Sequence, residues 1–290
     1  MTIAVPAPND FSLKGRRATD PGGLALTVLT CACITAVFAL PMLWIVLKSI
    51  QPESEVFSNN ILPSSLTLDN YARAVKSGHL LSYTLSTVLL AIATCCLVLP
   101  LGFIAGYGLA RFKFAGRGTL MFLFMFSLTI PGLVNLLAIY QAFTAIRLIN
   151  NPIGLVLVYT ASSLPLATWL SRAFILGIPV DIEEAGLVDG CSRIGGMFRI
   201  TLPLCLPGLG AVAIFVVVHV FQEFIIAQTL VTTRGIGVVS QGLRMMQSQY
   251  SLDYTALAAG AILVSIVPVG LFLIMQRQFI AGMTAGSVTS

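Results

Sequence analysis

Long apolar runs separated by short polar segments dominate this chain. A helix needs about 20 mostly apolar residues to cross a bilayer, and six windows satisfy that length, namely residues 24–47, 80–107, 119–144, 152–176, 206–230 and 256–280. Backbone N–H and C=O groups in the hydrocarbon region must pair within the chain, which favours helices. The pattern therefore predicts an all-α membrane protein with six transmembrane helices.

Prolines are expected inside these helices, at Pro41, Pro100, Pro131, Pro165 and Pro268. Proline removes a helix hydrogen bond and kinks the helix. Such kinks are tolerated where neighbouring helices or water satisfy the freed carbonyl groups. They favour a bundle that lines a path or changes shape, although irregular packing alone would also explain them.

Composition agrees with the apolar pattern. The 290 residues are 57% hydrophobic and only 9% charged, whereas soluble domains carry about 25% charged residues. The chain therefore cannot cover a water-facing surface, and its environment is a lipid bilayer. The six cysteines are expected to be small packing residues, and their spacing matches no metal site. No nucleic-acid partner is expected.

The basic residues give an orientation. Ten of the 16 fall on one side of the predicted membrane, and the other six are spread over longer loops on the opposite side. Because positive charge accumulates on the cytoplasmic side, both termini are expected in the cytoplasm. Residues 1–23 then form a cytoplasmic tail, and residues 24–290 form the transmembrane domain. A short amphipathic helix is expected from Asp69, in the largest outer loop.

One cytoplasmic segment has closely spaced charges: VDIEEAGLVDGCSRIGGMFRITLP, Val180–Pro203. Asp181 and Glu184 form a D-x-x-E variant of the capping box, which predicts a short helix. Gly190 is placed to end that helix in a left-handed conformation, and Ser192 to cap a second helix. The segment is either a well-capped loop or a docking helix that fits a partner's groove.

The fifth apolar window contains one charged residue, Glu223, with His219 one turn earlier on the same helix face. Ionisable residues inside a membrane bundle are functional candidates. The candidate pathway residues are His219, Gln222, Glu223 and Gln228. A polar clamp between helices, or a contact with a partner subunit, would explain them equally well. His219 and Glu223 alone are too few ligands for a metal.

The Val180–Pro203 segment resembles the EAA loop of the permease subunits of ABC importers. The matching residues are Glu184, Ala185, Gly190, Ile200, Leu202 and Pro203. Gly186 stands where a second alanine is usual, and the Asp189-Gly190 pair resembles the sugar branch of the family.

Other segments extend the resemblance. NYARAV, YGLARFKFAGR and FQEF all resemble the same family, with Gln222 in place of an asparagine. The ending QRQFIAGMTAGSVTS is similar to the tail of the maltose-type second permease, with Met283 in place of a leucine. The resemblance runs from about residue 48 to the C-terminus.

The resemblance implies a type I importer permease bundle in a prokaryotic inner membrane, with a cytoplasmic coupling helix. It implies a second permease subunit, two ATPase subunits and an extracytoplasmic solute-binding protein as partners. The residues expected to couple to the ATPase are Asp181, Glu183, Glu184, Ala185, Gly186, Asp189 and Gly190. The chain contains no G-x-x-x-x-G-K-[ST] phosphate loop. ATP and Mg are therefore expected on the partner ATPase, and this chain is expected not to be an enzyme.

Three alternatives stay open. The solute could be another polar molecule, such as a polyol or a glycerophosphodiester. The chain could instead be an ion-coupled secondary transporter that uses His219 and Glu223 as a proton relay, although six spans without a clear inverted repeat argue against this. A membrane scaffold would explain the docking segment but not the polar groups of the fifth window.

Overall fold

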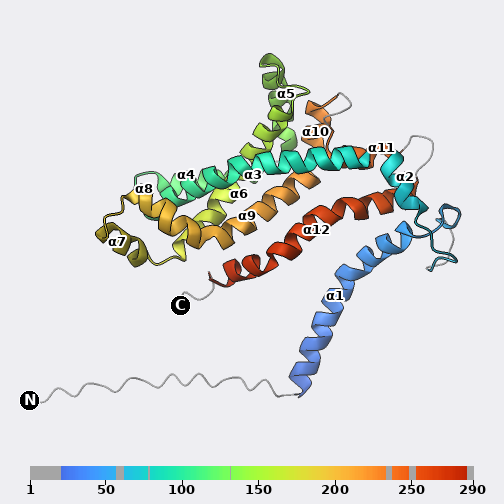
Figure 1. Cartoon of the computed structure of the whole chain (residues 1–290), viewed down its shortest axis with the longest axis horizontal. Coiled ribbons are helices and arrows are strands. Elements are labelled where there is room, and N and C mark those ends of the chain that lie inside the picture. The colour runs from blue at the N-terminus through green and yellow to red at the C-terminus, as the bar shows by residue number, and fades with distance from the viewer. Residues whose placement is uncertain are drawn as a thin grey trace, which may run out of the picture.

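The computed structural model (Figure 1) describes residues 21–56, 62–77, 79–130, 132–232, 237–247 and 253–285. The α-helices are α1 (Pro21–Ser49), α2 (Asp69–Ser77), α3 (Leu80–Arg111), α4 (Arg117–Ser127), α5 (Leu136–Ala145), α6 (Pro152–Leu176), α7 (Val180–Val188), α8 (Arg193–Gly196), α9 (Leu202–Gln222), α10 (Ile225–Leu230), α11 (Val239–Met245) and α12 (Tyr254–Ala285). This confirms the predicted all-α class. The predicted N-terminal tail up to residue 20 lies outside the described residues.

Five helices within these described ranges are long and apolar enough to cross a membrane. They belong to α1, α3, α6, α9 with the turns before it, and α12. The prediction of a single helix for the remaining window, residues 119–144, was wrong. It consists of α4, a 3₁₀ turn at Gly132–Asn135, and α5. The physical reason lies in the Pro131-Gly132 sequence, since proline disfavours helical backbone at the residue before it and glycine weakens a helix.

The predicted prolines lie inside helices wherever the structure describes them. Pro41, Pro100, Pro165 and Pro268 are interior residues of α1, α3, α6 and α12. Pro131 lies outside the described residues. α9 also has an interior proline, Pro207. Because proline has no backbone N–H, these five long helices each lack at least one backbone hydrogen bond.

The most extensive helix contact joins α3 and α6. It is built on small residues one turn apart, which let two membrane helices approach closely. A Cβ atom added to Gly102 would lie 3.0 Å from the Cβ of Ala167, and one added to Gly106 would lie 2.8 Å from the Cβ of Ser171. The two backbones are therefore nearly as close as their atoms allow.

The remaining long helices pack around this pair (Figure 1). α9 contacts both α3 and α6, and α12 packs on α9. α1 diverges from the bundle, and its main contact is with α12. α7 and α8 lie at one end of the long axis, whereas α2 and α11 lie at the other.

A polar network fixes the loop between α1 and α3, at the end of the bundle where α2 and α11 lie. The predicted amphipathic helix is α2, which packs on α12 and α3. Arg73 of α2 makes an ion pair with Glu53 and another with Asp253, whose oxygen is 3.3 Å away. It also donates a 2.9 Å hydrogen bond to Thr255. These bonds tie the loop between α1 and α3 to the start of α12.

The α3–α6 contact predicts a difference between two nearby glycines. Gly106→Ala should lower thermal stability, because the new methyl group would lie 2.9 Å from the backbone nitrogen of Arg172. Overpacking of this kind costs about 1–3 kcal/mol. Gly108→Ala is the matched control, since its added Cβ meets no atom within 4 Å. Thermal unfolding of the purified variants checks this, and equal melting temperatures would contradict the packing argument.

Candidate functional site

The expected short helix exists as α7, but it begins differently from the prediction. The residue that precedes the helix is Pro179, and no side chain caps it. Asp181 was predicted as the cap and instead lies within the first turn, so the D-x-x-E capping box was a wrong interpretation. Proline fixes φ near the helical value and readily starts a helix. Asp181 and Glu183 still place negative charge at the positive end of the helix dipole.

The end of α7 follows the prediction. Gly190 has a φ of +90°, which is the left-handed region that glycine tolerates best. Its N–H donates to the carbonyl of Leu187 at 3.1 Å, and the N–H of Cys191 donates to that of Gly186 at 2.9 Å. These two bonds form a Schellman motif. The Ser192 hydroxyl then accepts from Gly195 N at 3.0 Å and caps α8, as predicted.

Glu183 fixes α7 to the rest of the molecule. Its carboxylate lies in a buried cluster with Tyr107 and Arg111 of α3 and Thr201 of the π-helical turn that leads into α9. Arg111 Nε donates to Glu183 at 2.9 Å, the Thr201 hydroxyl donates at 2.8 Å, and the Tyr107 hydroxyl donates at 3.0 Å. Arg111 also donates to the carbonyl of Ile178, immediately before α7. We call these four side chains, those of Tyr107, Arg111, Glu183 and Thr201, the Glu183 cluster.

The protonation of Glu183 follows from these contacts. Burial alone would raise the pKa of this carboxyl group, because it disfavours the charged form. The hydrogen bonds from Arg111, Thr201 and Tyr107 outweigh burial and leave the pKa below its ordinary value of 4.5. At neutral pH the cluster is therefore a buried ion pair with two further hydroxyl donors.

α7 consequently has an inward and an outward face. Glu183 and Gly186 are buried, so neither residue is available on the surface of this chain. A Cβ added to Gly186 would lie 2.3 Å from Cδ1 of Ile200, so an alanine at this position would require the Ile200 side chain to shift. The other expected coupling residues, Asp181, Glu184, Ala185, Asp189 and Gly190, are exposed. Their contact with an ATPase remains a prediction.

The fifth apolar window contains a break at its charged residue. α9 ends at Gln222, and Glu223 has extended backbone with ψ 126°. The Glu223 side chain caps the next helix, α10: one carboxylate oxygen accepts from Ile226 N at 2.7 Å, and the other accepts from Ala227 N at 3.1 Å. The Tyr159 hydroxyl of α6 donates to it at 3.1 Å. Residues 206–230 were therefore wrongly predicted as one continuous helix.

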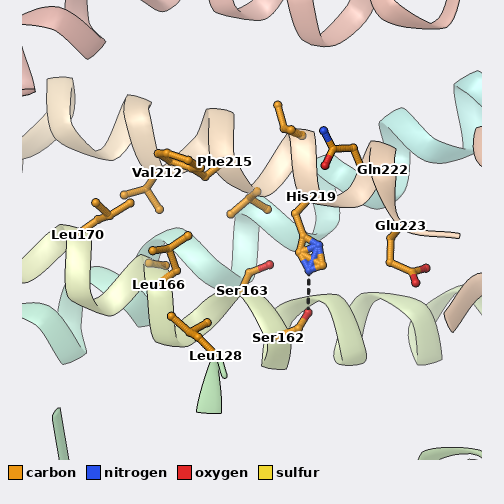
Figure 2. A pocket seen from close by; sticks show the side chains of 13 residues that line it. Leu128, Ser162, Ser163, Leu166, Leu170, Val212, Phe215, His219, Gln222 and Glu223 are labelled. Atoms are coloured by element: carbon orange, nitrogen blue, oxygen red, sulfur yellow. Dashed lines mark hydrogen bonds between the residues drawn. The ribbon is translucent and has the colours of Figure 1, made fainter. Parts of the chain in front are cut away.

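A groove of about 570 Å³ lies between α6 and α9, with Leu128 also lining it (Figure 2). Three of the predicted pathway residues, His219, Gln222 and Glu223, line one end. The fourth, Gln228, is on α10 outside the lining. The His219 ring hydrogen-bonds the Ser162 hydroxyl at 3.2 Å, whereas the Glu223 carboxylate has its own partners. The two side chains thus share a groove without pairing with each other in the described structure.

Several residues of both sites were missed from the sequence. Ser162 and Ser163 line the groove, and their adjacent hydroxyls within an apolar window were a usable signal. Tyr107 and Arg111 lie within YGLARFKFAGR, a segment that resembles the family, but nothing in that segment marks them as partners of Glu183. Nothing local in the sequence marks Thr201 as a partner of Glu183, because the two residues meet through the turn between α7 and α9.

The described chain is thus a bundle of long apolar helices with a groove that is polar at one end and a short helix, α7, that is anchored through Glu183. Residues 98–284 match the family described as the binding-protein-dependent transport system inner membrane component. The chain belongs to this family, which confirms the resemblance found in the EAA loop.

Named relatives support this assignment. The diacetylchitobiose uptake permease of Streptomyces coelicolor is 32% identical over 87% of this chain and 85% of its own length. The trehalose permease of Mycobacterium tuberculosis is 31% identical over 86% and 92%. The sulfoquinovosyl glycerol permease of Agrobacterium fabrum is 29% identical over 93% and 98%.

The fold also matches solved transporters. The chain superimposes with a TM-score of 0.70 on a bacterial ABC transporter involved in alginate import, with 17% identity over 88% of this chain and 96% of that one. A second match, with a TM-score of 0.67, is the alginate transporter in complex with its periplasmic protein. At these identities the likeness concerns the fold.

The Glu183 cluster predicts opposite outcomes for two adjacent glutamates. Glu183→Gln should destabilise the protein by about 3–5 kcal/mol, because it leaves the buried Arg111 without its counter-charge. Glu184→Gln is the matched control in the same helix turn, and its exposed side chain should change stability little. Thermal unfolding in detergent at neutral pH measures both. Equal effects would show that the cluster does not stabilise the fold.

The same cluster predicts a pH dependence. Because the pKa of folded Glu183 lies below 4.5, its contribution to stability is complete above that pH and is lost as the pH falls through the folded pKa. The difference in melting temperature between wild type and Glu183→Gln should therefore shrink below pH 4.5. A melting series from neutral to acidic pH measures it, and a constant difference would contradict the ion pair.

Proposed function

We propose that this chain is one of two permease subunits in an ATP-driven importer for a sugar or similar polar solute, and that α7 couples it to a separate ATPase. A second permease subunit would complete the pathway, two ATPase subunits would bind ATP and Mg, and an extracytoplasmic solute-binding protein would deliver the solute. The bias of basic residues supports cytoplasmic N- and C-termini.

The attachment of α7 to two membrane helices is the observation that carries this proposal. Glu183 of α7 accepts hydrogen bonds from Arg111 at the end of α3 and from Thr201 immediately before α9. A partner protein that moves α7 must therefore also move the end of α3 and the start of α9. The outward face offers apolar contact at Val188, which is 87% exposed, with Glu184 and Asp189 beside it. A partner's groove with apolar walls and basic residues would complement this face.

The same helices extend to the groove. α9 runs without interruption from Leu202, beside the Glu183 cluster, to Gln222 at the polar end of the groove. α6 supplies the opposite wall and is held against α3 by the small residues described above. Force applied at α7 would thus reach the walls of the groove directly through α9, and through α6 by its close contact with α3, as a two-state transport cycle requires.

The nature of the solute is supported by the relatives. The related permeases are named for transport of diacetylchitobiose, trehalose, arabinooligosaccharides and sulfoquinovosyl glycerol. A groove with hydroxyl, imidazole and amide groups beside apolar side chains suits a molecule with many hydroxyl groups. The ion-coupled alternative is less favoured, because His219 and Glu223 engage separate partners rather than one another.

The proposal predicts that a charge reversal on α7 releases the ATPase. Glu184→Lys should abolish co-purification of the ATPase subunits, since it inverts the charge of an exposed face without removing any hydrogen bond within the described structure. The assay is pull-down of the complex from membranes, together with measurement of ATP-dependent uptake.

Lys76→Glu on α2 is the control, since it reverses an exposed charge at the opposite end of the bundle. It should leave the ATPase bound. If Glu184→Lys retains the ATPase and supports uptake at the wild-type rate, α7 is only a capped loop and the coupling proposal fails.

A further inference from the structure

The groove between α6 and α9 contains a hydroxyl group that the chain itself leaves unused. Ser163 is only 7% exposed, and its oxygen has no hydrogen-bond partner among the described residues. Its side chain lines the groove from the α6 side, facing α9 (Figure 2). An unpaired buried hydroxyl is costly, so a partner that enters the groove would stabilise it.

Other polar groups of the groove also suit a partner that donates and accepts hydrogen bonds. Gln222 is exposed at the groove and has no hydrogen-bond partner among the residues described, and its amide can both donate and accept. The His219 ring and the Ser162 hydroxyl add a second donor–acceptor pair. These groups match the hydroxyl groups of a sugar, which also both donate and accept.

The charge of the groove narrows the class of solute that it could bind. Glu223 is the only carboxylate in the lining, and neither lysine nor arginine lines it within the described part of the chain. Both Glu223 oxygens already accept hydrogen bonds from Ile226, Ala227 and Tyr159. A fixed carboxylate without a neighbouring cation repels an anionic solute, which acts against such solutes as a selectivity element.

The other end of the groove is apolar. Leu166 and Leu170 of α6 face Val212 and Phe215 of α9 there (Figure 2). Sites for small molecules commonly combine such apolar walls with a few placed polar groups, in volumes of about 300–1,000 Å³. The apolar walls can cover the C–H faces of a sugar ring while its hydroxyl groups reach Ser163 and Gln222.

We propose that this groove is a solute subsite for an uncharged, polyhydroxylated solute, in which Ser163 is a specificity-determining hydrogen-bond partner. This inference rests on the proposed function, because it requires the groove to be part of the transport pathway. It goes further by assigning a neutral solute, whereas one transporter of the same fold is described as importing an acidic polysaccharide.

The test uses the complete importer, with its partner permease, ATPases and solute-binding protein, in liposomes. The Ser163→Cys variant is exposed to a water-soluble methanethiosulfonate reagent, and labelling is read peptide by peptide by mass spectrometry, which separates the new thiol from the native cysteines. Ser171→Cys is the matched control, because Ser171 is also a buried, unpartnered hydroxyl of α6 but faces Gly106 of α3.

The probes differ in charge. Trehalose and diacetylchitobiose serve as neutral probes, and sulfoquinovosyl glycerol and alginate oligosaccharides serve as anionic probes. ATP-dependent uptake of every probe is measured in parallel.

We expect the thiol of Ser163→Cys to be labelled and that of Ser171→Cys to stay unlabelled. A neutral probe that is imported should slow labelling at position 163 at least about fivefold, which is about 1 kcal/mol of protection.

An anionic probe that is imported and protects this position would overturn the neutral assignment while leaving the pathway intact. An imported probe that leaves labelling unchanged, or a thiol at position 163 that the reagent does not reach, would overturn the subsite. Absence of ATP-dependent uptake for all four probes would instead contradict the proposed function itself.

Ser163→Ala provides an independent measurement. Loss of one neutral hydrogen bond should weaken binding of the imported radiolabelled sugar to the purified importer, without its solute-binding protein, by about 2- to 10-fold. Ser171→Ala should leave that binding unchanged. Equal binding by wild type and Ser163→Ala would contradict the assigned role of Ser163.

Discussion

The close approach of α3 and α6 positions both functional regions of this molecule. The contact at Gly106 and Ser171 is immediately followed in α3 by Tyr107 and Arg111, which hold Glu183. In α6 the same contact region is preceded by two serines that line the groove. A larger residue at Gly106 would therefore shift two sites at once. Bilayers offer little hydrophobic drive for helix association, so small residues that allow close packing contribute much of the cohesion here.

Buried polar groups in this protein differ in how they are satisfied, and the consequences differ too. The Glu183 cluster is satisfied by donors from separate segments, and this makes it a rigid joint at neutral pH. Glu223 is satisfied mainly by its own neighbouring backbone, so it holds a local break in a membrane helix. Ser163 is not satisfied at all within the described structure. In the proposed cycle, the Glu183 cluster transmits movement and Glu223 shapes the groove. The Ser163 hydroxyl is available to hydrogen-bond a solute that enters the groove.

Much of the fold could be predicted from the sequence, because hydrophobic length is a strong signal in membranes. Five of the six windows contain a long apolar helix, and the Gly190 turn and the Ser192 cap follow from local residue chemistry. The break at Glu223 could not be predicted, since a charged residue in an apolar run is compatible with a helix. The Glu183 cluster was also beyond sequence reasoning, because its members approach one another only through tertiary packing.

The placement of α1 has a consequence for biogenesis. α1 is synthesised before α12, the helix against which it mainly packs. Throughout synthesis the apolar surface of α1, with residues such as Phe38 at 74% exposure, must be covered by lipid or by the membrane-insertion machinery. The α3–α6 pair and α9 can assemble among themselves during this time. Among the described helices, α1 is thus made before the others but reaches its main packing partner only after they have been made.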